Sequence, residues 1–225
     1  MRTVVVTGGK RGIGKAIAAA FADERVVPLS SADLDVTDEA AVTRVFAEIG
    51  PVDVLVNNAG VSDSAPLART TLEAWQRQLA VNATGAFLCT RAVIDGMKER
   101  NRGRIVTVAS AASHHGARYI APYTASKHAV LGLMRSVAAE LAGTGVTANS
   151  VCPAYVRSDM TDATIANIEA RTGRQDGEQA LAKMAALGRL IEPEEVAFAV
   201  LFFAAAEAGA INGQSLIMDG GGLQQ

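Results

Sequence analysis

The stretch Thr3-Val4-Val5-Val6-Thr7-Gly8-Gly9-Lys10-Arg11-Gly12-Ile13-Gly14, with the alanine-rich residues 15–22 behind it, decides the fold of this chain. A β-branched run, a glycine turn and a helix in this order form the context in which such glycines bind a dinucleotide. Gly8 allows the sharp turn, while Gly12 and Gly14 let the backbone and the next helix approach a pyrophosphate at the helix N-terminus. The spacing is G-x-x-x-G-x-G rather than G-x-G-x-x-G, so a plain tight connection is the alternative interpretation.

Apolar runs and helical stretches alternate along the rest of the chain, which predicts an α/β protein with a doubly wound parallel sheet, the Rossmann fold. The predicted strands, in the order 3-2-1-4-5-6-7, cover residues 3–6, 25–29, 34–37, 52–56, 104–109, 146–151 and 215–218. The predicted helices cover residues 15–22, 39–49, 72–100, 122–142 and 194–206. Only residues 30–33 separate the second strand from the third, too few for a crossover helix, so we expect this sheet edge to be trimmed or covered by a loop.

Length and composition fit a single domain, residues 1–225, that binds a small molecule. The chain has 225 residues, 49% of them hydrophobic, and a net charge of −2, so it shows no electrostatic footprint for nucleic acid. It enters its first strand without a signal peptide and has no apolar run of the ~20 residues that span a membrane, so we expect a soluble, cytoplasmic protein. Cys89 and Cys152 lie far apart in apolar stretches, and we expect buried packing residues rather than a disulfide or a metal site.

The end of the second predicted strand bears on the choice of cofactor, because it should lie beside the adenosine ribose. An acidic residue there selects a free 2′-hydroxyl, but this chain has Ser30 and Ser31. Lys10 and Arg11 add positive charge in the glycine loop, and together these residues favour the 2′-phosphate of NADP over NAD. Asp33 is the counter-argument, since a carboxylate folded back onto the ribose would favour NAD.

The stretch Tyr123-Thr124-Ala125-Ser126-Lys127 has the pattern of an acid-base site. Tyr123 and Lys127 stand one turn apart on the same face of a helix, so the phenol and the ammonium can serve one site. A fixed cation favours the phenolate and moves the pKa of Tyr from about 10 toward neutral pH, where it can give or take a proton. Taken alone, the pattern also fits two unrelated residues on a solvated helix.

Polar residues follow two further predicted strands at the edge where parallel sheets bind ligands. Asn57-Asn58-Ala59-Gly60 closes the strand 52–56, and Ser110 follows the strand 104–109. Asn82 lies within an apolar helical segment, where its amide needs either a local partner or a site to face.

Four of these motifs occur in the order and spacing of one known family. They are T-G-x-x-x-G-x-G at 7–14, N-N-A-G at 57–60, Ser110 thirteen residues before Tyr123, and Y-x-x-x-K. From end to end, the chain resembles the compact type of the short-chain dehydrogenase/reductase family. The resemblance implies hydride transfer between a nicotinamide cofactor and a ketone or secondary alcohol, with Tyr123 as general acid or base. It also implies that Lys127 lowers the pKa of Tyr123 and binds the nicotinamide ribose, that Ser110 holds the substrate oxygen, and that Asn82 anchors a relay water.

The resemblance further implies a set of contacts. The cofactor-binding residues would be Gly8, Lys10, Arg11, Gly12, Ile13, Gly14, Ser30, Asp35, Val36, Asn57, Ala59, Gly60, Tyr123, Lys127, Pro153, Val156 and Ser158. The substrate-binding residues would be Ser110, Ala112, Tyr123 and Tyr155, with no metal. The chain departs from the family in its short second crossover and in having P-A-Y-V-R-S at 153–158 for P-G-x-V-x-T, where Ala154 adds a methyl group and Ser158 keeps a hydroxyl.

Residues 155–190 are polar and carry short helical signals, and we interpret them as a lid over the site, with a surface insertion as the alternative. Apolar members that suit an acyl or alicyclic group are Tyr155, Met160, Met184 and Leu187. Basic members that suit the phosphates of a CoA or carrier-protein thioester, or simply a solvated surface, are Arg157, Arg171, Arg174 and Lys183. His114 and His115 can line the pocket but lack the partners of a metal site.

The lid resembles those of 3-oxoacyl thioester reductases and of hydroxy-alicyclic acid dehydrogenases. We therefore expect a 3-oxoacyl thioester reductase, with an NAD-dependent dehydrogenase of an alicyclic or other secondary alcohol as the alternative. A non-catalytic dinucleotide-sensing protein would not need all four of the expected catalytic residues, which are Asn82, Ser110, Tyr123 and Lys127. An epimerase of the extended branch would need a larger C-terminal domain than 225 residues hold. Relatives pack the C-terminal helix and strand across two-fold axes, which implies a homotetramer or homodimer, although an apolar helix also fits an internal core.

Overall fold

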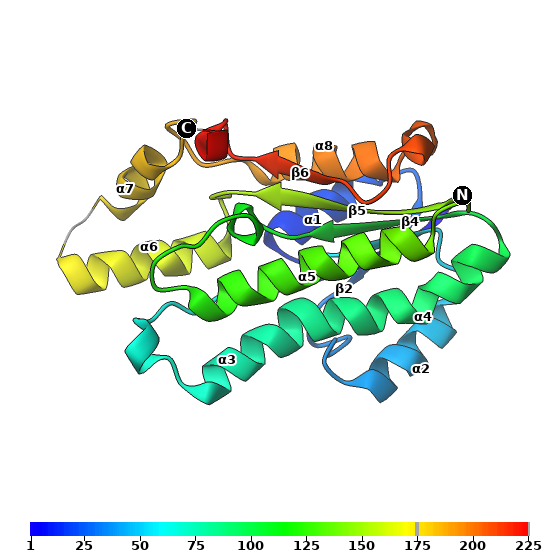
Figure 1. Ribbon diagram of the computed structural model, residues 1–225, viewed down its shortest axis with the longest axis horizontal. Helices are drawn as coiled ribbons and strands as arrows, with labels where there is room; N and C mark the ends of the chain where they lie inside the picture. Colours follow the sequence, from blue (N-terminus) through cyan, green and yellow to red (C-terminus); the bar gives the residue numbers. More distant parts are fainter. Residues whose placement is uncertain (174–175, 225) are drawn as a thin grey trace.

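The computed structural model describes residues 1–173 and 176–224, and at its centre is a parallel sheet of six strands (Figure 1). The strands are β1 (Thr3–Thr7), β2 (Arg25–Leu29), β3 (Val54–Asn57), β4 (Gly103–Val108), β5 (Val146–Pro153) and β6 (Ser215–Met218). Their order is β2-β1-β3-β4-β5-β6, so the chain leaves β1 to one side for β2 and returns to its other side for β3. The predicted doubly wound fold is confirmed, and this reversal is the point at which such sheets bind ligands.

Two layers of helices cover the sheet. The main helices are α1 (Gly12–Ala20), α2 (Glu39–Ile49), α3 (Leu72–Leu79), α4 (Gly85–Glu99), α5 (Ala121–Glu140) and α8 (Pro193–Ala204). Val5 of β1 belongs to the core formed with α2, α4 and α5, whereas Val4 and Val6 belong to the core formed with α1 and α8. Successive strand residues face opposite layers, and because both faces are buried the strands are continuous apolar runs.

The predicted strand at residues 34–37 does not form, so the sheet has six strands and not the seven of the order 3-2-1-4-5-6-7. Parallel neighbours need a crossover of about a dozen residues or more, and only residues 30–33 were available. The segment is a loop in which the Asp35 carboxylate accepts hydrogen bonds from the backbone N–H of Thr37 at 2.9 Å and from its hydroxyl at 2.7 Å. Leu34 and Val36 are nevertheless buried, in the core that α2, α4 and α5 form with Val5 of β1. Asp38 then caps α2, which covers the predicted residues 39–49.

The long helix predicted over residues 72–100 is present but interrupted. Between α3 and α4 the residues Ala80–Thr84 form a π-helical turn, which widens the backbone around Asn82. At the start of the chain, α1 begins at Gly12 and not at Lys15, so Gly12 and Gly14 lie in its first turn. Shorter 3₁₀ turns occur at Leu67–Arg69, Ala111–Ser113, Ala206–Ala210 and Gly222–Gln224.

Two further helices, α6 (Asp159–Thr172) and α7 (Gly177–Met184), lie beyond the carboxyl ends of the strands, at the left of Figure 1. A single parallel bridge between Val156 and Ile191 joins the two ends of this segment. Arg174 lies outside the described residues, and so does the side chain of Arg171. Cys89 and Cys152 are buried free thiols, as predicted. In the part of the chain that the structure describes, no helix has the length and apolar character needed to cross a membrane.

The amino edge of the sheet is closed by charged side chains that bind backbone groups. Asp53 accepts a hydrogen bond from the Thr3 N–H at 2.9 Å and pairs with Arg102 at 2.9 Å. Arg2 pairs with Glu24 at 2.8 Å and donates to the Ala204 carbonyl at the end of α8. Arg104 donates to the next two carbonyls, those of residues 205 and 206, at 3.1 and 3.3 Å. These bonds satisfy carbonyls that a helix leaves open at its C-terminus.

Candidate active site

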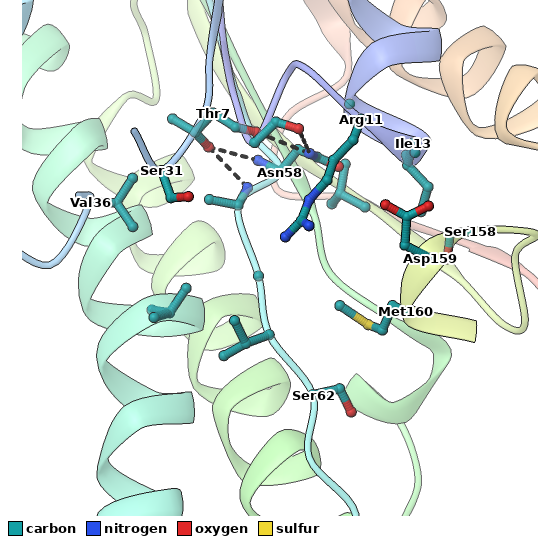
Figure 2. Close-up of a pocket in the computed structure, with 18 of the residues that line it drawn as sticks. Thr7, Arg11, Ile13, Ser31, Val36, Asn58, Ser62, Ser158, Asp159 and Met160 are labelled. Atoms are coloured by element: carbon teal, nitrogen blue, oxygen red, sulfur yellow. Dashed lines mark hydrogen bonds between the residues drawn. The ribbon is translucent and has the colours of Figure 1, made fainter. Parts of the chain in front are cut away.

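A cavity of about 670 Å³ opens at the carboxyl edge of the sheet, at the switch point between β1 and β3. It extends from the glycine turn to Tyr123 and Lys127, and the start of α6 forms another wall (Figure 2). The residues expected to bind cofactor that line it are Gly8, Lys10, Arg11, Gly12, Ile13, Gly14, Ser30, Asp35, Val36, Ala59, Gly60, Tyr123, Lys127, Pro153, Val156 and Ser158. One cavity therefore brings together residues that lie between Thr7 and Thr161 in the chain.

The glycine turn brings the backbone of the first turn of α1 into close contact with the end of β1. Gly8 and Gly12 have positive φ angles of +64° and +48°, which side chains rarely tolerate. A Cβ at Gly14 would lie 2.1 Å from the Gly8 carbonyl oxygen and 2.6 Å from Asn58 Nδ2. The first turn of α1 can approach the end of β1 this closely only because Gly14 has no side chain. The N-terminus of α1 then faces a cavity wide enough for an anionic group.

Thr7 and Asn58, neither of which we expected to have a role, hold the glycine turn against the end of β3. Thr7 Oγ1 accepts hydrogen bonds from the N–H groups of Asn58 and Ala59, both at 3.0 Å. In return, Asn58 Nδ2 donates to the carbonyls of Thr7 at 3.0 Å and Gly8 at 3.2 Å, as Figure 2 shows. The signal was present in the sequence, since Thr7 opens one motif and Asn58 stands inside another.

Asn57, which we expected to bind cofactor, does not line the cavity. Its side chain points into the layer of α4, where Nδ2 donates to the hydroxyls of Thr90 at 3.0 Å and Thr107 at 3.3 Å. Asn57 is the last residue of β3, and successive residues face opposite sides of a strand, so Asn58 turns to the cavity instead.

At the end of β2 the charged residues pair with each other. The Asp33 carboxylate accepts from the Ser30 N–H at 2.7 Å and from the Ser30 hydroxyl at 2.5 Å, and it pairs with Lys10 Nζ at 2.8 Å. These hydrogen bonds from Lys10 and Ser30 hold the pKa of Asp33 well below its usual range. Arg11 extends into the cavity in Figure 2, and within residues 1–173 and 176–224 its guanidinium has no ion pair. Arg11 is thus the cation of this loop that is free to meet a ligand.

Tyr123 and Lys127 lie in the first turns of α5, on the cavity wall. Lys127 is buried, and its Nζ donates to the Val108 carbonyl at 2.9 Å while lying 5.7 Å from the centre of the Tyr123 ring. Burial lowers the pKa of Lys127 to about 8. Burial raises the pKa of Tyr123, against a hydrogen bond with the Ser110 side chain that lowers it. The lowered Tyr pKa expected from the sequence is therefore not found here, because Lys127 is directed to a carbonyl and not to the phenol.

Ser110 follows β4 and begins the 3₁₀ turn Ala111–Ser113, with its hydroxyl accepting from the Ala112 N–H at 3.1 Å. It is buried beside Tyr123 and does not itself line the cavity. Ala112, which is also buried, and Tyr155 stay outside the cavity wall as well. Of the four residues expected to bind substrate, only Tyr123 faces the cavity.

Asn82 joins the segment after β3 to α5. Its Oδ1 accepts from the Val61 N–H at 2.8 Å, and its Nδ2 donates to the Val61 carbonyl and to the Ser126 hydroxyl, both at 2.9 Å. The amide is buried and lies in the π-helical turn between α3 and α4. The widened turn explains how a polar side chain in an apolar helical stretch finds its partners.

The segment 155–190 contributes its first residues to the cavity. Ser158 caps α6, and Met160 lies across the cavity from Ser62 in Figure 2. Arg157 is not free to bind a phosphate, since it pairs with Glu178 of α7 at 2.8 Å and with Glu192 at 3.2 Å. Lys183, Met184 and Leu187 are exposed and outside the cavity. His114 and His115 do not line the cavity either.

Comparison with known proteins places this arrangement in a family. Residues 24–222 match the family model described as enoyl-(acyl carrier protein) reductase. The acetoacetyl-CoA reductase of Rhizobium meliloti (strain 1021) is 34% identical over 98% of this chain and 98% of its own length. The 3-oxoacyl-(acyl-carrier-protein) reductase of Vibrio cholerae serotype O1 is 36% identical over 98% of this chain and 96% of its own.

Among solved structures, a putative NAD(P)-dependent gluconate 5-dehydrogenase from Beutenbergia cavernae with bound NADP superposes with a TM-score of 0.88. The two sequences are 36% identical, and the match covers 100% of this chain and 97% of the other. The glycine turn, the segment after β3, Ser110 and the Tyr123–Lys127 pair lie at one sheet edge, and the matches extend over nearly the full chain. The chain belongs to the short-chain dehydrogenase/reductase family and is an oxidoreductase.

Proposed function

We propose that the protein reduces 3-oxoacyl thioesters with NADPH and that Tyr123 protonates the substrate oxygen. The observation that carries the proposal is the single cavity that joins the glycine turn to Tyr123 and Lys127. Its cofactor end fits a dinucleotide, because Gly8, Gly12 and Gly14 leave space in which a side chain would clash or strain the backbone. Curated relatives over almost the full chain are named as reductases of acetoacetyl-CoA and of 3-oxoacyl carrier-protein substrates.

The proposed mechanism uses side chains at the Tyr123 end of the cavity. A bound nicotinamide cofactor supplies the hydride. Tyr123, with its pKa raised by burial, is neutral at pH 7 and can donate its proton to the substrate oxygen as negative charge develops there. Ser110 does not line the cavity, so we assign it an indirect role, in which its hydroxyl lies beside Tyr123 and orients the phenol toward that oxygen. Lys127 lies on the same helix face, and its ammonium stabilises the phenolate that remains after proton transfer.

The preference for NADPH is assigned mainly to Arg11. A 2′-phosphate beside the end of β2 would meet Arg11, Ser30 and Ser31, which all line the cavity. Lys10 contributes less, because Asp33 already neutralises it at 2.8 Å. The same ion pair turns Asp33 away from the ribose role that would favour NAD, and Asp33 does not line the cavity. The gluconate dehydrogenase structure with bound NADP supports this preference.

A dehydrogenase of a small polyol is the second candidate, because solved structures of gluconate dehydrogenases superpose on the whole chain. The two candidates differ in what the wall near α6 must accept. Met160 presents an apolar thioether there, which suits an acyl chain better than a row of hydroxyls.

We assign residues 155–190 the role of a lid within one domain, with Arg157 holding α7 through Glu178.

We further propose that the protein assembles as a homotetramer or homodimer through α8 and β6. Phe198 on α8 is 74% exposed, and Phe202, one turn further along α8, and Leu216 on β6 are also exposed. Apolar side chains of this size seldom remain in water in a group. Sedimentation analysis of wild type and Phe198→Glu tests the assignment, and a wild-type monomer would contradict it.

The substrate proposal is tested by following NADPH or NADH oxidation with acetoacetyl-CoA, crotonyl-CoA and cyclohexanone, and reduction of NADP with gluconate. We expect turnover of acetoacetyl-CoA with NADPH. Crotonyl-CoA tests the reaction that the family model's description names, reduction of a carbon–carbon double bond. Turnover of crotonyl-CoA alone, or of gluconate alone, would contradict the proposed substrate class. Dinucleotide binding without any turnover would favour a sensing protein.

A further inference from the structure

We propose that Ser126 is a positioning residue. It fixes the distance between the cavity wall at Val61, in the segment after β3, and α5, the helix that carries Tyr123 and Lys127. This inference rests on the proposed roles of those two residues. Ser126 Oγ accepts a hydrogen bond from Asn82 Nδ2 at 2.9 Å and donates its own proton to the Tyr123 carbonyl at 2.7 Å. It therefore links Asn82 to the backbone of Tyr123 itself.

On its other side, Asn82 is bound to the cavity wall. Its amide makes both backbone hydrogen bonds to Val61, at 2.8 and 2.9 Å, and Val61 lines the cavity one residue after Gly60. Val61 alone decides which way the amide faces, because its N–H needs the oxygen and its carbonyl needs the nitrogen. Ser126 adds one further hydrogen bond, from Asn82 Nδ2 to Ser126 Oγ. This bond sets the distance between α5 and the cavity wall at Val61.

The hydrogen bond between Asn82 and Ser126 is buried, and every polar hydrogen of the two side chains has an acceptor. Ser126 is 0% exposed and Asn82 is 2% exposed, so water cannot replace a lost partner without entering the core. Both amide protons of Asn82 and the single hydroxyl proton of Ser126 are engaged. Removing the Ser126 oxygen leaves one buried N–H unpaired, which favours displacement of the amide.

Displacement of the Asn82 amide would change the electrostatic surroundings of Lys127. A Cβ placed on Gly60 would lie 3.3 Å from Asn82 Oδ1 and 3.7 Å from Lys127 Nζ, so the amide oxygen and the ammonium border the same small space. A partly negative oxygen favours the charged lysine, which also faces the titratable groups of Tyr123 on its own helix and Cys152 on β5. Without Ser126 we expect this support to weaken, and the pH above which Lys127 loses its proton to fall.

The competing view is that Ser126 only bonds back to its own helix, as serine often does, and that its loss affects stability alone. A matched control exists in the same core. Thr90 accepts a hydrogen bond from the buried amide of Asn57 at 3.0 Å, away from the cavity. Thr90→Val removes an equivalent acceptor without touching the catalytic helix.

The test compares steady-state kinetics of wild type, Ser126→Ala, Ser126→Cys and Thr90→Val with NADPH and acetoacetyl-CoA across pH 6 to 10. We expect Ser126→Ala to lower kcat about 10- to 100-fold, as a misplaced catalytic group does, with little change in KM for NADPH and an alkaline limb moved to lower pH. Ser126→Cys keeps a weaker donor and acceptor, and its kcat should fall between wild type and Ser126→Ala. Thr90→Val should match Ser126→Ala in lost thermal stability and keep wild-type kinetics.

Wild-type kcat and pH profile in Ser126→Ala would overturn the inference, and so would an equal loss of kcat in Thr90→Val. If Ser126→Ala does not fold, the kcat and pH profile of Ser126→Cys decide in the same way. Failure of the proposed function looks different, because the wild-type enzyme itself would then not reduce acetoacetyl-CoA.

Discussion

The two edges of the sheet use polar groups in opposite ways. At the amino edge, Arg2 and Arg104 bind the carbonyls at the end of α8, and Asp53 binds the backbone N–H of Thr3 in β1. At the carboxyl edge, the chain keeps a cavity of about 670 Å³, glycines in conformations that side chains rarely adopt, and Arg11, which has no ion pair among the described residues. The difference shows that this fold gains stability at one edge and keeps the other open for ligand and chemistry. Substitutions at the two edges should therefore separate stability from activity.

The largest effect on this contrast is expected from Gly14→Ala. Its methyl group would stand 2.1 Å from the Gly8 oxygen, so the glycine turn must shift and the pyrophosphate site is lost. We expect NADPH affinity to fall by about a hundredfold or more, together with a loss of about 1–3 kcal/mol in the free energy of unfolding from overpacking. Calorimetric titration with NADPH measures the first and urea denaturation the second.

The control is Gly132→Ala on α5, where a new methyl group meets nothing within 4 Å. A glycine in a helix interior costs roughly 0.5–1 kcal/mol relative to alanine, so this variant should be slightly more stable with unchanged binding. Equal NADPH affinity in the two variants would refute the close approach inferred at the glycine turn.

The second effect is a pH dependence that the open edge imposes on stability. The pKa of Lys127 is about 8 in the folded protein against an ordinary value of 10.5. Between these two pH values the unfolded chain holds a proton that the folded protein has released, so stability rises with pH there. The gain is on the order of 3 kcal/mol, since one pKa unit corresponds to about 1.4 kcal/mol.

Other groups titrate in this range, so the measurement is a difference between two proteins. Urea denaturation of wild type and Lys127→Met from pH 7 to 10.5 gives the two slopes, and the wild-type slope should be the more positive. Parallel curves of stability against pH for the two proteins would mean that burial does not destabilise the charged form of Lys127.

The third effect belongs to the closed edge. Arg104→Met removes the donors to the carbonyls of Ala205, Ala206 and Gly145. Hydrogen bonds to charged groups contribute about 1.5–3 kcal/mol, and Arg104 is only partly buried, so we expect a loss near 1–2 kcal/mol. Thermal unfolding should then occur about 2–8 °C lower. With NADPH and acetoacetyl-CoA, kcat and KM at 25 °C should be unchanged, and a kinetic defect would show that the edges are coupled.

The smallest effect compares two cations within the open edge. Arg11→Met should weaken NADPH binding by about tenfold or more, since a charge-assisted contact with the 2′-phosphate is lost, and leave NADH binding unchanged. Lys10→Met should do less, because Lys10 is already paired with Asp33. Titration calorimetry of both variants with both cofactors measures the order. A larger loss in Lys10→Met would mean that the ion pair opens when the cofactor binds.

Much of this site could be predicted from sequence, because its motifs encode local geometry. The turn at Gly8 and Gly14 needs residues without side chains, and the spacing of Tyr123 and Lys127 puts both on one helix face. The strands are apolar runs in the sequence, and α2 begins at the predicted residue, Glu39. These are properties of a few consecutive residues.

What the sequence did not reveal depends on contacts between distant segments. Asn57 and Asn58 are identical neighbours, and only the phase of β3 decides that Asn58 faces the cavity. Thr7 binds a loop 51 residues away, and the Asn82 amide in the π-helical turn finds its partners in the distant residues Val61 and Ser126. Residues 34–37 have the composition of a strand, but the connection is too short to place them in the sheet.

The central claim is that Tyr123 is the acid of this cavity, and Tyr123→Phe tests it most directly. The change removes the transferable proton and keeps the ring on the cavity wall. Stopped-flow measurement of NADPH oxidation with saturating acetoacetyl-CoA should show a rate lower by about 10²- to 10⁴-fold, the usual contribution of general acid catalysis, with NADPH affinity unchanged. An unchanged rate in a folded, NADPH-binding variant would contradict the account.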